Sequence, residues 1–115
     1  MHTTALKYLY DIRRAADRIS KFCNDKNFDD YEANDQLRAA VERQFEISGE
    51  ALNQLTKKDQ AIAAKITAYR HIIAFRNLLI HGYADVDDRL VWDMVQFRLP
   101  TLQAEILALS NPDQL

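Results

Sequence analysis

Residues 66–80 are I-T-A-Y-R-H-I-I-A-F-R-N-L-L-I, a stretch with helical spacing that is apolar over most of its surface. On a wheel of about 100° per residue, its apolar side chains spread over more than half the circumference. They are Tyr69, Ile72, Ile73, Phe75, Leu78, Leu79 and Ile80. A surface helix normally shows a narrower apolar stripe. We therefore expect the bundle core to cover one side of this helix and a second copy of the chain to cover another, since two-fold dimers are the commonest oligomers.

Arg76 lies inside this apolar arc, between Ile72 and Ile80. A guanidinium in such a place is costly unless it is paired or lines a cleft. On wheel position alone, the favoured interpretation is that Arg76 pairs with Glu46 or Glu50 of the preceding helix. The other interpretation is that it lines a functional cleft.

The opposite face of the same helix is polar. Arg70, Ala74, Asn77 and His81 follow one another at three- and four-residue steps, and Gly82 is the expected helix-ending residue. His81 is then either a favourable cation in the last turn of the helix or a catalytic group. The geometry of the helix does not favour one of these over the other.

Apolar residues recur at helical spacing in the rest of the chain as well. We predict four main helices, over about residues 4–23, 35–55, 66–80 and 87–109. We expect the acidic connector before the second helix to be solvated, and residues 57–65 to form a short helix or an extension. Asp87 is the expected N-cap of the last helix, which Pro100 should kink or split. Short connections between amphipathic helices predict an all-α, four- to five-helix, antiparallel up-and-down bundle.

Composition narrows the function classes. A length of 115 residues fits a single domain over residues 1–115. Two glycines and two prolines are too few for turn-rich β folds, and no glycine-rich phosphate loop is present. One cysteine excludes a disulfide within the chain and a multi-cysteine zinc site, and it fits a cytoplasmic location. We expect no metal and no cofactor. We also expect no membrane segment, because the longest apolar runs have only four residues.

The net charge of −2 means that any nucleic-acid surface must be local. Residues 60–84 contain no Asp or Glu, but they include Lys65, Arg70, Arg76 and two histidines. This basic segment either attracts a polyanion such as RNA or simply reflects a buried helix that avoids charge.

Arginine and histidine together suit RNA cleavage without a metal. That reaction needs a base for the 2′-hydroxyl, an acid for the leaving oxygen and a cation for the phosphorane charge. One chain supplies too few such groups, whereas two copies supply two arginines and two histidines. Arg76 and His81 are about 140° apart on an ideal helix. They can share a phosphate only if His81 lies at a loosened helix end or acts across the dimer.

Residues 76–83, R-N-L-L-I-H-G-Y, resemble the R-N-x-x-x-H-x-Y motif of HEPN-fold proteins. The resemblance is closest to HepT-like toxins, formerly described as nucleotidyltransferase substrate-binding subunits. Residues 47–51, I-S-G-E-A, are similar to the family's I-x-G-E-A segment. Val91-Trp92 followed by Leu99-Pro100 is similar to its V-W…L-P pattern. The resemblance covers about residues 6–109.

The resemblance implies a HEPN bundle that dimerises through the motif helix, with a metal-independent endoribonuclease site between the two motifs. It implies that Arg76 and His81 are the catalytic pair, with Asn77 in support; Arg70 is a further candidate for RNA contact. Tyr83 would be the residue that a nucleotidyltransferase (MNT-type) antitoxin modifies with AMP.

Two rival functions stay open at this stage. The first is the toxin ribonuclease of a toxin–antitoxin system, neutralised by its partner. The alternative is a catalytically silent HEPN subunit that binds a nucleotide or RNA and serves a nucleotidyltransferase. A purely structural helical dimer is a weaker third hypothesis.

Overall fold

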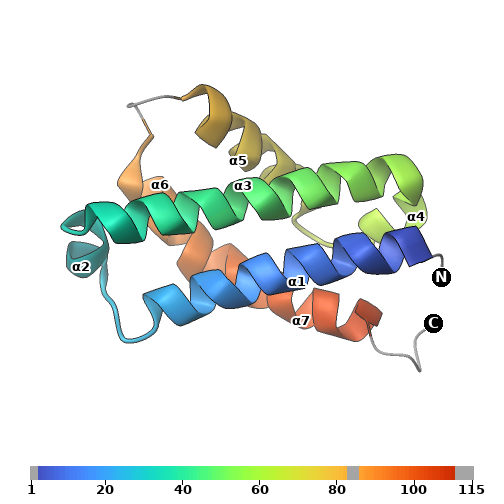
Figure 1. Ribbon diagram of the computed structural model, residues 1–115, viewed down its shortest axis with the longest axis horizontal. Helices are drawn as coiled ribbons and strands as arrows, with labels where there is room; N and C mark the ends of the chain where they lie inside the picture. Colours follow the sequence, from blue (N-terminus) through green and yellow to red (C-terminus); the bar gives the residue numbers. More distant parts are fainter. Residues whose placement is uncertain (1–2, 83–85, 111–115) are drawn as a thin grey trace.

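The computed structural model describes residues 3–82 and 86–110, and this part of the chain is helical without strands. Its elements are α1 (Thr3–Cys23), α2 (Phe28–Glu32), α3 (Asp35–Lys58), α4 (Gln60–Ala63), α5 (Tyr69–His81), α6 (Asp88–Asp93), the π-helix η2 (Met94–Arg98) and α7 (Leu99–Ser110). The long helices alternate in direction along the chain (Figure 1). The predicted all-α bundle is therefore confirmed, and the four predicted helical stretches are all present.

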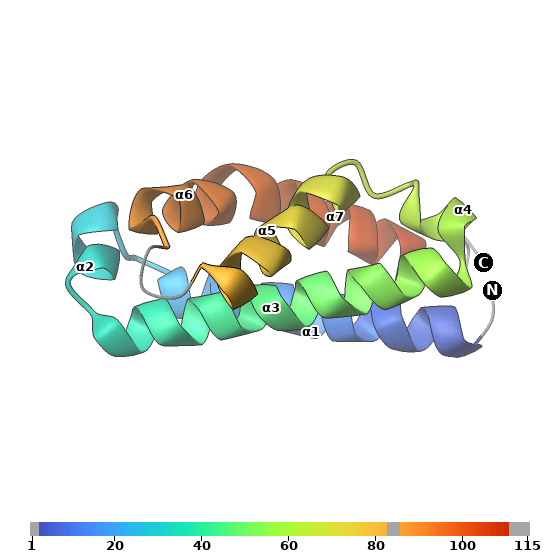
Figure 2. The ribbon, with the colours of Figure 1, turned by 90° about the horizontal axis from the view of Figure 1, so that it is seen from above.

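The bundle is organised around the pair α1 and α3. Helix α5 packs on α3, and α7 packs on α1. Seen from above, α1 and α3 run along one side of the bundle, with α5, α6 and α7 along the other (Figure 2). Apolar residues on helical spacing make this core: Leu9, Ile12, Ala16 and Ile19 from α1, and Val41, Phe45, Leu52 and Leu55 from α3. The aromatic rings of Phe45 and Phe75 meet edge to face, with centroids 5.1 Å apart, so that α3 and α5 share one core.

The expectation of a merely solvated acidic connector is wrong in one respect, because residues 28–32 form the helix α2. Asn27 and Asp30 make a reciprocal capping box that starts it. Tyr31 is fully buried, and its ring centroid lies 5.4 Å from that of Trp92. The acidic side chains of the connector do face solvent, but Tyr31 in the same segment packs into the core.

The last helical stretch continues through Pro100, with a turn widened just before the proline. The π-turn η2 precedes the proline, and the Leu99 N–H bonds the carbonyl of Met94 five residues back. A wider turn makes room for the proline ring, which would otherwise collide with a carbonyl of the preceding turn. Asp87 caps α6 as expected, accepting a bond of 2.9 Å from the Arg89 N–H.

Helix α5 begins at Tyr69, three residues later than predicted. Its N-cap, Ala68, has no side chain to cap the helix. The Glu105 carboxylate of α7 instead accepts bonds from the Thr67 N–H and from the Thr67 hydroxyl, the latter at 2.6 Å. A tertiary contact thus fixes where this helix starts. Within the described residues, no helix combines the length and the apolarity needed to span a bilayer.

Candidate active site

The site begins with an unusually close contact between α3 and α5. A Cβ atom placed on Gly49 would lie 2.3 Å from the Cβ of Arg76 and 3.3 Å from the carbonyl oxygen of Ile72. Real Cβ contacts do not reach 2.3 Å, so only glycine fits at this crossing. The missing side chain of Gly49 lets the backbone of α5 settle against α3 at the point where Arg76 emerges.

Arg76 is held by two neighbours at this crossing. Its Nη2 lies 2.7 Å from Glu50 Oε2, and its Nη1 donates to Asn77 Oδ1 at 2.9 Å. The buried Nε has no hydrogen-bond partner among the described residues. About a quarter of the Arg76 side chain remains exposed, at 24%. The guanidinium is therefore oriented by its own chain and still reachable by a ligand.

Of the two carboxylates that the sequence left open for Arg76, the structure pairs it with Glu50. Glu46 lies one turn earlier on α3, where its Oε2 is 3.4 Å from Nη1 of Arg43. Asn77 lies next to the guanidinium as a hydrogen-bond acceptor. Arg70 is elsewhere: it lies about 9 Å farther toward the start of α5, and its Nε donates to the Tyr69 hydroxyl at 2.9 Å. That bond lowers the pKa of Tyr69.

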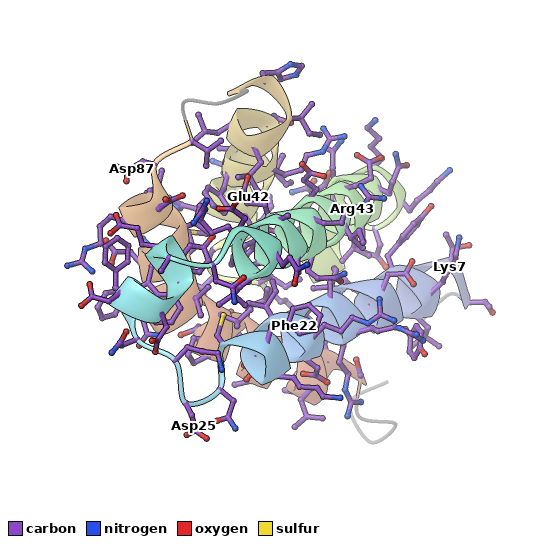
Figure 3. The ribbon with its side chains drawn as sticks, turned by 60° about the vertical axis from the view of Figure 1, so that its left-hand side comes forward. Lys7, Phe22, Asp25, Glu42, Arg43 and Asp87 are labelled. Carbon is purple, nitrogen blue, oxygen red and sulfur yellow. The ribbon has the colours of Figure 1, made fainter. Side chains whose placement is uncertain are left out.

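Arg76 opens into a groove of about 280 Å³ that crosses α1, α3 and α5. We call it the Arg76 groove. Its lining includes Tyr8 and Asp11 from α1, Arg43, Glu46 and Glu50 from α3, and Ile80 from α5. Figure 3 shows Arg43 on α3, between the ribbons of α1 and α5. No sequence pattern indicates that α1 contributes to this groove, because that depends on how the helices pack.

His81 lies outside the Arg76 groove. It is the last residue of α5, and its side chain is exposed on the polar face with Arg70, Ala74 and Asn77. Gly82 ends the helix, as expected, with φ −79° and ψ −15° in the right-handed region. A Cβ on Gly82 would lie 2.6 Å from the Leu78 carbonyl oxygen. Tyr83 lies outside the described residues.

The apolar arc of α5 is only partly covered within one chain. Ile72, Phe75 and Leu79 are buried along its centre. At its two edges, Leu78 is 43% exposed and Ile80 is 39% exposed. These exposed apolar side chains lie on the same helix as Arg76 and His81.

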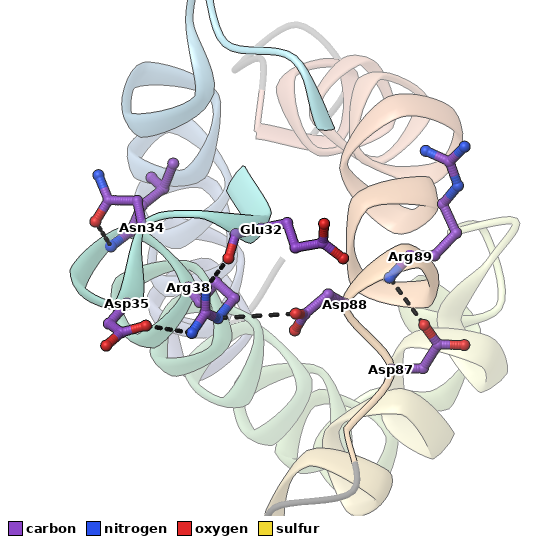
Figure 4. Close-up of polar contacts among 8 residues, drawn as sticks. Glu32, Asn34, Asp35, Arg38, Asp87, Asp88 and Arg89 are labelled. Atoms are coloured by element: carbon purple, nitrogen blue, oxygen red, sulfur yellow. Dashed lines mark hydrogen bonds and ion pairs between the residues drawn. The ribbon is translucent and has the colours of Figure 1, made fainter. Parts of the chain in front are cut away.

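Other titratable groups have structural explanations. Cys23 is buried, and burial raises the pKa of its thiol to about 11, so it is not a reactive thiolate. Arg38 of α3 bonds Asp35 and the Glu32 carbonyl and lies 3.8 Å from Asp88, at the start of α6 (Figure 4). Within residues 3–82 and 86–110, no group of three His, Cys, Asp or Glu side chains is arranged to hold a metal ion.

Comparisons with known proteins bear on the family of the chain. The family model described as "Ribonuclease HepT-like" matches residues 12–109. The chain is 29% identical over 99 residues to a Methanocaldococcus jannaschii protein named "Putative RNase", covering 86% of this chain and 90% of that one. It is 32% identical over 98 residues to a Thermococcus cleftensis protein named "Probable ribonuclease HepT", covering 85% and 88%. No solved structure matches the chain in such a comparison.

Proposed function

Because this chain belongs to the ribonuclease HepT-like family, we propose that it is a metal-independent endoribonuclease whose active site forms between two copies of the chain. The observation that carries the proposal is the state of Arg76. A guanidinium fixed by Glu50 and Asn77, partly exposed in a groove, is prepared to receive a phosphate.

Two copies are needed because one copy separates the two motif residues. Arg76 faces α3, whereas His81 faces solvent at the end of α5, about 140° further around the helix. A two-fold axis near this helix brings His81 of one protomer toward Arg76 of its partner. It also covers the exposed edges of α5 at Leu78 and Ile80.

The proposed reaction is an internal transfer at phosphorus. One His81 takes the proton of the 2′-hydroxyl, and the 2′-oxygen attacks the adjacent phosphorus. The bond from phosphorus to the 5′-oxygen breaks, and the second His81, protonated, gives its proton to that oxygen. The products are a 2′,3′-cyclic phosphate and a 5′-hydroxyl. Arg76 stabilises the extra negative charge on the phosphorane oxygens.

We also propose that the protein is the toxin of a toxin–antitoxin pair, silenced by AMP transfer to Tyr83. The Tyr83 oxygen attacks the α-phosphorus of ATP on the partner nucleotidyltransferase, pyrophosphate leaves and the phenolic proton passes to solvent. The support is that Tyr83 is two residues from His81 in sequence. A bulky anion there blocks the site and repels RNA phosphates. Tyr83→Phe should keep cleavage but lose ATP-dependent silencing; full silencing of this variant would contradict the modification.

The test of the ribonuclease is cleavage of single-stranded RNA in EDTA by the wild type, Arg76→Ala and His81→Ala. The matched control is His71→Ala, which removes an exposed histidine from the same helix outside the Arg76 groove. Mass spectrometry first confirms that Tyr83 is unmodified. We expect a loss of about 100-fold or more in Arg76→Ala and His81→Ala but not in the control.

Mixing the wild type with an excess of His81→Ala tests the shared site. A heterodimer of these two chains holds a single His81 and lacks either the base or the acid, so we expect cleavage to fall as the share of heterodimer rises. No cleavage by unmodified wild type, together with RNA or nucleotide binding, would favour the silent binding subunit instead. Monomeric protein that cleaves as well as the dimer would contradict the composite site.

A further inference from the structure

Helix α1 carries a basic groove that the proposed catalytic reaction does not use. The groove has a volume of about 340 Å³. Its lining is Tyr10, Arg13, Arg14, Asp17, Arg18 and Lys21. We call it the α1 groove. Helix α1 has five basic and two acidic residues in a chain whose net charge is −2, so positive charge is concentrated here.

The carboxylate in the α1 groove is already engaged. Asp17 Oδ1 accepts a bond of 3.0 Å from the Gln103 amide of α7, and Asp17 Oδ2 lies 3.8 Å from Arg13 Nε. Within the described residues, Arg14, Arg18 and Lys21 form no ion pair with an acidic side chain. Three cations on adjacent turns of one helix thus remain available to an anion.

Tyr10 adds an aromatic surface to these cations. Its side chain is 57% exposed, which is unusual for so large a ring, and its hydroxyl accepts a bond of 3.2 Å from Arg14 Nη1. An exposed ring beside oriented guanidinium groups suits a nucleic acid, because the ring can stack on a base while the cations contact phosphates.

The α1 groove and the Arg76 groove both lie along helix α1. Asp11 lines the Arg76 groove, and Arg18 lines the α1 groove. These two residues are seven apart, so they share one flank of α1. Arg43 of α3 lines the Arg76 groove and is 68% exposed. The Arg76 groove also holds the carboxylates of Asp11, Glu46 and Glu50, so the α1 groove, with four cations and one carboxylate, is the more positive of the two.

We infer that the α1 groove binds the sugar–phosphate backbone of single-stranded RNA beyond the nucleotides that are cleaved. This inference rests on the proposed function for the identity of the ligand. Arginine side chains contact phosphates without regard to sequence, so the groove adds affinity and orientation rather than base specificity. An RNA long enough to leave the Arg76 groove uses it, and a dinucleotide does not.

The experiment compares RNA binding by two triple variants, both made in the His81→Ala protein so that the RNA stays intact. One is Arg14→Ala with Arg18→Ala and Lys21→Ala. The control is Lys57→Ala with Lys58→Ala and Arg98→Ala, which removes three cations that line neither groove. The probe is a fluorescein-labelled, single-stranded RNA of about 20 nucleotides, titrated at several salt concentrations. Circular dichroism checks that both variants are folded.

We expect the α1 variant alone to lose affinity, by roughly tenfold at low salt. The slope of log Kd against log salt should fall by about 2, since each phosphate contact to a single strand contributes about 0.7. In protein with His81 intact, cleavage of a dinucleotide should be unchanged by the α1 substitutions, while KM for the long RNA rises.

Equal RNA affinity and equal salt slope in the two triple variants would overturn the inference, whether or not the wild type cleaves RNA. Loss of affinity in the α1 variant supports it, and this result does not depend on catalysis. If the wild type binds RNA through α1 but cleaves no RNA, the proposed ribonuclease activity is wrong and RNA binding by the α1 groove is supported.

Discussion

Helix α3 makes two junctions with the elements that flank residues 83–85, and the two are built differently. At the α5 junction, Gly49 admits the Arg76 backbone and Glu50 binds its guanidinium at 2.7 Å. At the α6 junction, Arg38 reaches Asp88 only at 3.8 Å (Figure 4). Burial raises the pKa of Glu42 at this junction, and the like charge of Asp88 raises it further.

This difference indicates which junction fixes the site. The α5 junction is set by steric fit together with a short ion pair, so a small change there displaces Arg76. The α6 junction is a looser balance of attraction and repulsion, and it tolerates change. Substitutions at four positions, two at each junction, test this ranking.

Gly49→Ala should have the largest effect, because its new Cβ collides with Arg76. We expect RNA cleavage to fall by about 100-fold, as a misplacement near 1 Å can cost that much. We expect unfolding in urea to show a destabilisation of about 1–3 kcal/mol from overpacking. Alanine normally stabilises a helix relative to glycine by up to about 1 kcal/mol. A more stable variant with full activity would therefore show that the close crossing is unimportant.

Glu50→Gln should reduce cleavage by about tenfold, because Arg76 loses the charge that orients it. The effect on stability should be small, about 0.5 kcal/mol, since the Glu50 side chain is 44% exposed and the pair is screened. Glu46→Gln is the matched control, because Glu46 pairs with the exposed Arg43 instead. Equal activities of the two variants in the EDTA assay would argue against an orienting role for Glu50.

Asp88→Asn should change cleavage by less than about twofold and stability by less than about 0.5 kcal/mol. The substitution removes a weak attraction to Arg38 and a repulsion from Glu42 together, and the two nearly cancel. Urea unfolding and the cleavage assay measure both effects. If Asp88→Asn inactivates the enzyme as strongly as Gly49→Ala, the ranking of the two junctions is wrong.

Glu42→Gln should give the smallest effect, and one that depends on pH. Burial, followed by Asp88 and Glu46, raises the pKa of Glu42 above its ordinary value of 4.5. The folded state therefore favours the protonated acid, and this contribution to stability is lost as pH rises through the raised pKa. The variant should match the wild type near pH 4 and be slightly more stable at pH 7 in thermal melts. A destabilised variant at pH 7 would contradict this.

Much of the fold followed from local spacing. The apolar residues of α1, α3 and α5 recur at helical steps, and Asn34 and Asp87 cap the helices that they precede. What was missed depended on distant partners. Helix α2 is anchored by Tyr31 against Trp92, and the start of α5 is fixed by Glu105, 38 residues beyond Thr67. No local sequence pattern near these residues predicts such contacts.

Some features of the candidate site are likewise visible in the sequence, whereas others depend on how the helices pack. The motif from Arg76 to Tyr83 is visible in the sequence, and so is the glycine before Glu50. The reason for that glycine is not visible in the sequence. A glycine in a helix is merely destabilising until α5 is known to pack against it. The contribution of α1 to both grooves was likewise hidden, since helical spacing predicts faces but not neighbours.

The sequence alone is enough to show that the chain is helical, that the helix carrying Arg76 is too apolar for a simple surface position, and that Arg76 and His81 lie on different flanks of it. These properties depend on periodicity, which is local. Tertiary structure alone decided that Arg76 pairs with Glu50 and not with Glu46, one turn away on the same helix. That choice depends on where two helices cross, and Gly49 lies at this crossing, where its missing Cβ lets the backbones approach closely.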